Sequence, residues 1–150
     1  MKWLWLTQLA VTLYMTGVIW LVQIVHYPLF AQVGRDGFAG YEARHTSWIT
    51  WVVAPAMVIE LGTALALLAV RPVGVPAGAL WVGIGLLAVI WLSTLLLQVP
   101  AHSVLAEGFD AGAHRRLVAS NWVRTLAWTA RSLLLLVLTA RLLAVGMGDG

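Results

Sequence analysis

The sequence predicts an all-α fold, an integral membrane bundle of four helices. Hydrophobic residues make up 61% of the chain, charged residues 10%, and the mean hydropathy is +0.90, values that exclude an ordinary soluble domain. Four apolar stretches are each long enough to cross a bilayer core about 30 Å thick, which takes about 20 helical residues. The connections are too short for a separate soluble domain, so residues 1–150 are expected to form a single transmembrane domain.

The apolar runs and the residues that follow them predict four spans, at residues 3–27, 48–70, 79–99 and 118–145. Pro28 is expected to end the first helix and Pro100 the third, because proline disrupts helical hydrogen bonding. Pro72 and Pro76 lie in the short turn after the second span. The first span is too long for the apolar region of a signal peptide and lacks a small-x-small cleavage site, so it is predicted to remain as a bundle helix.

The tryptophans agree with this topology, because they are expected at the two membrane interfaces. We call the side that holds both termini the terminal face, and the side that holds residues 28–47 and 100–117 the loop face. The terminal face is predicted to carry Trp3, Trp5 and Trp81, and the loop face Trp48, Trp51 and Trp122. The basic start and the even number of spans favour termini inside, in the cytoplasmic membrane of a bacterium.

Composition also limits the partners. The chain has no cysteine, which excludes disulfides and thiolate metal ligands. Its net charge of +3 is spread over both faces and no nucleic-acid-binding pattern is present. The bilayer, a homo-oligomer or a larger membrane complex are the expected macromolecular surroundings.

A shift of 71 positions suggests an internal repeat. It aligns Trp20-Leu21 with Trp91-Leu92, Gly37-Phe38 with Gly108-Phe109, and Arg44 with Arg115. The bundle is therefore a candidate duplicated helical hairpin; the alternative is that similar interfaces recruit similar residues.

Two charges lie deep inside the predicted spans, where each costs about 2.5 kcal/mol or more without a partner. Glu60 on the second helix and Arg131 on the fourth are at similar distances from the loop face. Equal depth predicts an ion pair. Its expected role is to brace the two helices, with a buried proton or substrate anchor as the alternative.

Other polar residues recur at helical spacing on the first, third and fourth helices. Because lipid offers no hydrogen-bond partners, these stripes should face the bundle interior. At the loop-face end they are predicted to converge on one group of side chains: Gln23, His26, Gln98, His102, Asn121 and Arg124.

All four histidines are predicted to lie on the loop face. Glu42 and His45 have the Glu-x-x-His spacing found in carboxylate-bridged metal bundles, and together with His26 and His102 they could bind iron, copper or zinc. Haem between His26 and His102 is a less favoured hypothesis, since both lie near the membrane surface. Wet interfacial histidines without a metal are the alternative, and His114 is expected to be an ordinary loop residue.

Two segments carry a resemblance to a known family: Gln98-Val99-Pro100-Ala101-His102, and Asn121-Trp122-Val123-Arg124-Thr125 before a final apolar helix. They resemble the anthrone-oxygenase-like family of small four-helix membrane proteins, although His102 replaces a common asparagine. The resemblance implies an oxygenase of polycyclic phenolic substrates without an obvious cofactor. In that interpretation Asn121, Arg124 and His102 hold a phenolate and oxygen.

Two classes of function follow from these patterns. The first is a membrane oxidoreductase or oxygenase that acts on a small lipophilic or quinone-like substrate in a polar pocket at the loop face. The second is a non-catalytic membrane subunit or small-molecule-binding protein, in which the same side chains hold helices together or face a partner.

Overall fold

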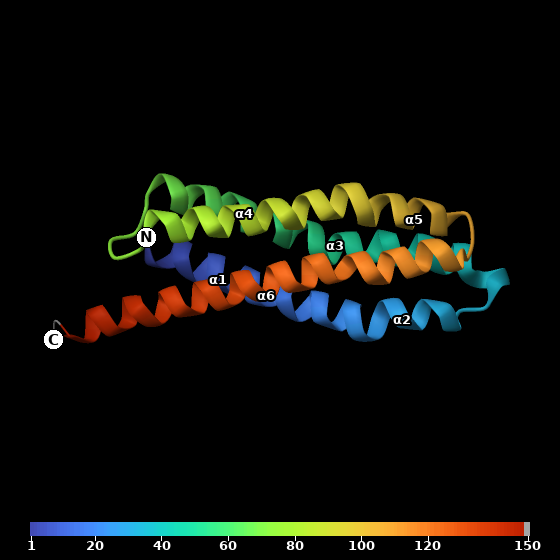
Figure 1. Cartoon of the computed structure of the whole chain (residues 1–150), viewed down its shortest axis with the longest axis horizontal. Helices are drawn as coiled ribbons and strands as arrows, with labels where there is room; N and C mark the ends of the chain where they lie inside the picture. The colour runs from blue at the N-terminus through green and yellow to red at the C-terminus, as the bar shows by residue number, and fades with distance from the viewer. Residues whose placement is uncertain (149–150) are drawn as a thin grey trace.

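Four long helical rods make up residues 1–148, the part of the chain that the computed structural model describes (Figure 1). The first rod contains α1 (Lys2–Leu21), the π-helical η1 (Val22–His26), α2 (Tyr27–Leu29) and the short η2 (Phe30–Gln32). The second is α3 (Arg35–Ala69), the third contains α4 (Ala77–Ser93), the π-helical η3 (Thr94–Gln98) and α5 (Val99–Ala106), and the fourth is α6 (Ala111–Gly148). The predicted all-α four-helix bundle is confirmed. The predicted single domain also includes residues 149–150, which lie outside the described residues.

Each rod is long and apolar enough to cross a membrane, which supports an integral membrane protein. The rods are 31, 35, 30 and 34 residues long in their apolar, described parts. At 1.5 Å per residue, 30 to 35 residues extend about 45 to 52 Å, more than a bilayer core of about 30 Å. The loop-face end carries exposed charges that mark the excess length: Arg35, Asp36, Arg44, Glu107, Asp110, Arg115 and Arg116.

Pro28 and Pro100 do not end their helices, contrary to the sequence prediction. The first rod continues to Gln32 and the third to Ala106. Each proline follows a π-helical segment by two residues, and the carbonyl four residues before it belongs to that segment. The wider π turn avoids the clash between the proline ring and this carbonyl, and it accommodates the hydrogen bond that proline cannot donate, so the helix continues.

The first and third rods thus share one backbone feature, a π-helical segment followed two residues later by a proline. Val22 and Thr94, which begin the π segments, are 72 residues apart, as are Pro28 and Pro100. This register differs by one residue from the 71-residue shift of the sequence comparison. A duplicated hairpin stays a prediction.

The rods pack side by side, with α4 lying along α6, and the N-terminus and the C-terminal end of α6 lie at the end that holds the α3–α4 connection (Figure 1). Trp5 is buried, 6% exposed, and its Nε1 donates a hydrogen bond to the Thr139 hydroxyl at 2.9 Å. The other five predicted interface tryptophans are exposed by 38% to 79%. At the loop-face end, buried aromatic residues such as Phe30 and Phe38 close the bundle.

Candidate functional site

A buried carboxylate and an imidazole form the centre of the site. Helix α3 begins at Arg35 rather than at residue 48, so Glu42 and His45 lie within a helix and not in the predicted loop. Glu42 has no exposed surface, and its Oε1 lies 2.5 Å from His102 Nδ1 on α5. In the tautomer of His102 that carries its proton on Nδ1, this contact is a hydrogen bond donated to the carboxylate, and Nε2 keeps a lone pair. That Nε2 lies 3.0 Å from the Tyr27 hydroxyl, which donates to it in the same tautomer.

The other histidines surround this centre. His26 Nε2 lies 2.8 Å from His45 Nδ1, and the Phe30 ring packs edge-on against both imidazoles. His114 lies in the first turn of α6, and its Nε2 donates to the Tyr27 carbonyl at 2.7 Å. The prediction that His114 is an ordinary loop residue is wrong, because it holds the backbone of Tyr27.

The four predicted metal ligands are gathered, but as two hydrogen-bonded pairs: His26 with His45, and Glu42 with His102. Within residues 1–148, no three or more His, Asp or Glu side chains are arranged as a metal site. Glu42 Oε2 and His45 Nε2 are buried and have no hydrogen-bond partner among the described residues. A transition metal or haem at these residues stays a prediction.

Arg124 on α6 supplies a cation to a cavity that His102 also lines. Its Nε donates to Asn121 Oδ1 at 3.0 Å, and its NH1 lies 3.3 Å from the Thr94 hydroxyl. Asn121 is fixed in turn, since its Nδ2 donates to Gln23 Oε1 at 2.9 Å. Among the described side chains, no carboxylate lies within 4.0 Å of the Arg124 guanidinium. Arg124, on one of the converging polar stripes, is therefore a cation with no acidic partner among the described residues.

A cavity of about 390 Å³ connects these groups. Tyr27, His102 and Arg124 all line it, whereas Asn121 stands behind Arg124. Most of the remaining wall is apolar, and the first rod and α3 supply seven of its apolar residues: Met15, Val18, Ile19, Val22, Ile49, Val53 and Met57. An apolar cavity with a few convergent polar groups is the usual form of a small-molecule site.

No protein-family model, curated protein or solved structure matches this chain. Functional proposals for it rest on its own side chains, and membership of the anthrone-oxygenase-like family stays a prediction.

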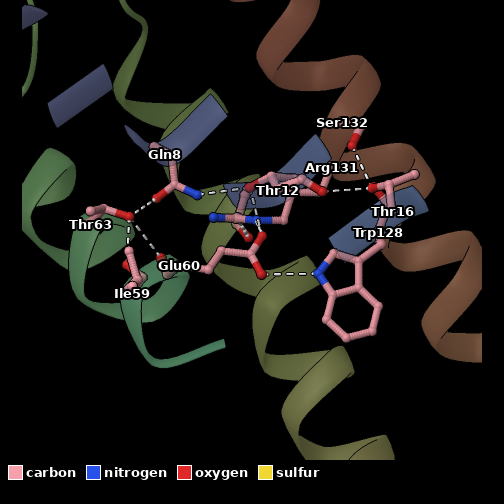
Figure 2. A network of polar contacts seen from close by, with 10 residues as sticks. Gln8, Thr12, Thr16, Ile59, Glu60, Thr63, Trp128, Arg131 and Ser132 are labelled. Carbon is pink, nitrogen blue, oxygen red and sulfur yellow. Dashed lines mark hydrogen bonds and ion pairs between the residues drawn. The ribbon is translucent and has the colours of Figure 1, made fainter. Parts of the chain in front are cut away.

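Glu60 and Arg131 form the predicted ion pair in the middle of the bundle (Figure 2). Arg131 Nε donates to Glu60 Oε1 at 2.8 Å, and Arg131 NH1 donates to the Gly83 carbonyl. Thr12 donates to Glu60 Oε1 at 2.7 Å and Trp128 Nε1 to Glu60 Oε2 at 3.0 Å. The pair thus connects helices α1, α3, α4 and α6. Neither charge lines the large cavity, so the contacts fit a structural brace.

Tyr27 is the site residue that sequence reasoning missed. Because Tyr27 precedes Pro28, the sequence predicts that it ends the first helix, where a buried hydroxyl is not expected. The π-helical η1 carries the helix past this point, so that Tyr27 faces His102 and the cavity. No pattern in the sequence distinguishes this continuation from a helix end.

Proposed function

We propose that the protein binds a small lipophilic molecule with an acidic hydroxyl, a phenol or an enol, and removes its proton. One observation supports this proposal most directly. Tyr27, His102 and Arg124 line a single, mostly apolar cavity, and the imidazole of His102 contacts both the Tyr27 hydroxyl and the buried carboxylate of Glu42.

The proton follows the hydrogen bonds between these groups. Tyr27 gives its proton to His102 Nε2 and receives the proton of the ligand hydroxyl. The imidazolium that forms is stabilised by Glu42, whose Oε1 is 2.5 Å from Nδ1. The oxyanion on the ligand is stabilised by Arg124, which has no acidic partner among the described residues. Such preorganised charge is most effective in a site from which water is excluded.

An ionised phenol or enol is electron-rich and transfers electrons readily to an acceptor such as molecular oxygen or a quinone. This chemistry suits a membrane oxygenase or oxidoreductase, and it agrees with the phenolic substrates that the family resemblance implies. A protein that binds and ionises the ligand without turning it over would instead belong to the small-molecule-binding class.

The test uses 4-methyl-2-nitrophenol, whose visible absorption rises when its hydroxyl ionises. The protein in lipid nanodiscs is titrated with this probe at a pH where the free probe is mostly neutral, with empty nanodiscs as the reference. We expect the bound probe to be ionised. His102→Gln should lose the ionisation, and Arg124→Leu should weaken binding roughly ten- to hundredfold, because a hydrogen bond to a charged group contributes about 1.5–3 kcal/mol.

Arg116→Leu is the matched control, since Arg116 is an exposed arginine on the same helix and does not line the cavity. It should leave binding and ionisation unchanged. A wild-type protein that binds the probe only in its neutral form, or equal ionisation by all the variants, would overturn the proposal. Consumption of oxygen or reduction of an added quinone then separates an enzyme from a binding protein.

A further inference from the structure

The exposed residues of the cavity wall lie on two helices, α3 and α5. Four residues of its wall are exposed: Thr50 on α3, and Val99, Ser103 and Ala106 on α5. Every other residue of the wall is buried or half-buried. The mouth of the cavity is therefore the gap between α3 and α5.

The surface of this mouth is effectively apolar. The Thr50 hydroxyl donates to the Thr46 carbonyl at 2.6 Å, and the Ser103 hydroxyl donates to the Val99 carbonyl at 3.0 Å. Each hydroxyl is thus bonded to its own helix, and the side chains that surround the gap are small. An alkyl chain could lie there without leaving a polar group of the wall unsatisfied.

The level of the mouth places it beside lipid. Trp48 and Trp51, next to Thr50 on α3, are 71% and 79% exposed, as expected at a membrane interface. The first exposed charges beyond the mouth are Arg44 on α3 and Glu107 after α5. The gap therefore opens at the edge of the apolar core of a bilayer.

We infer that the ligand is a single-chain amphipath dissolved in the membrane. Its oxygen-bearing head lies against His102 and Arg124, and its alkyl or prenyl chain leaves through the gap between α3 and α5. This inference rests on the proposed function. A volume of about 390 Å³ is near the lower end of ligand cavities, which run from about 300 to 1,000 Å³, so a ring system fits inside and a long chain must extend outside.

The experiment compares 4-methyl-2-nitrophenol with 4-dodecyl-2-nitrophenol in nanodiscs, each corrected for its partition into empty nanodiscs. If the chain leaves through the mouth, wild-type protein binds and ionises both probes with corrected affinities equal within about threefold, or about 0.7 kcal/mol. Ala106→Trp should fill the mouth and weaken binding of the dodecyl probe about tenfold more than binding of the methyl probe, a difference of about 1.4 kcal/mol. Ser103→Trp, a second variant at the mouth, should behave in the same way.

Val104→Trp is the matched control, because Val104 is exposed on the same helix but is not part of the cavity wall. It should affect neither probe, and circular dichroism should show that all three variants are folded. Ala106→Trp and Ser103→Trp that bind the dodecyl probe as well as Val104→Trp does would overturn the inference.

A second measurement uses the absence of cysteine from the natural chain. In the Ala106→Cys variant, the dodecyl probe should slow maleimide labelling of the new thiol and the methyl probe should not, whereas Val104→Cys should be labelled equally with either. Wild-type protein that binds the methyl probe and rejects the dodecyl probe would refute the exit of the chain but leave the proposed function intact. Ionisation of neither probe would refute both.

Discussion

Breaking the central ion pair gives the sharpest test of how the bundle is held together. Glu60 is fully buried and accepts hydrogen bonds from Arg131, Thr12 and Trp128. Glu60→Gln preserves the shape of the side chain but removes the charge that balances Arg131. Its new amide N–H groups also cannot accept from Trp128, so at least one buried donor loses its acceptor.

The magnitude follows from these contacts. A charge left near the centre of a membrane costs about 2.5–3.5 kcal/mol, and each hydrogen bond lost between membrane helices adds about 0.6 kcal/mol. Removal of one partner of a buried pair typically costs about 3–5 kcal/mol. We expect Glu60→Gln and Arg131→Gln each to lower the free energy of unfolding by about 3 kcal/mol.

The assay is reversible unfolding in mixed micelles with increasing SDS, followed by circular dichroism. The double variant should lose far less than the sum of the two single losses, with a coupling of about 2 kcal/mol or more, because it leaves no isolated charge. Glu107→Gln, at an exposed glutamate, is the control and should stay within about 0.5 kcal/mol of wild type. Losses that add within about 0.5 kcal/mol would refute a direct pair.

Three further outcomes are expected. A Cβ at Gly83 would lie 3.1 Å from Arg131 NH1, so Gly83→Ala should destabilise the protein in the same SDS assay by about 1–3 kcal/mol, whereas Gly85→Ala, which meets nothing within 4 Å, should not. Trp5→Phe removes the hydrogen bond to Thr139 and should cost about 1 kcal/mol in that assay, with Thr139→Val giving a similar loss; an unchanged Trp5→Phe would contradict the bond. Metal chelators should leave the ionisation of the bound nitrophenol probe unchanged, as measured by its visible absorption. Loss of the ionisation with chelator, and its return with iron, copper or zinc, would favour the predicted metal site instead.

The fold could be predicted because the membrane constrains it strongly. Long apolar runs must form helices there, since their backbone groups have no other partners. The same constraint says little about where a helix ends outside the apolar core. For that reason the sequence predicts loops at residues 35–47 and 111–117, which belong to α3 and α6, and it predicts helix ends at Pro28 and Pro100.

The candidate site could be predicted in part. Helical spacing indicates that His102, Asn121 and Arg124 converge. In the structure His102 and Arg124 line one cavity, and Asn121 accepts a hydrogen bond from Arg124 behind the cavity wall. Spacing carries no information on which polar groups pair with each other. The contact of Glu42 with His102, and that of His26 with His45, depend on how α3, α5 and the first rod pack.

The length of the rods has a consequence for chemistry at the site. Helix α3 extends well beyond a bilayer core, and the candidate site lies where the exposed tryptophans of α3 give way to exposed charges. A molecule held there would have its hydrocarbon portion in an oil-like phase and its reactive oxygen at the edge of the aqueous phase. The bundle would then collect a reactant that is concentrated in the hydrocarbon core of the membrane and hold its oxygen at the depth where the protein surface becomes charged.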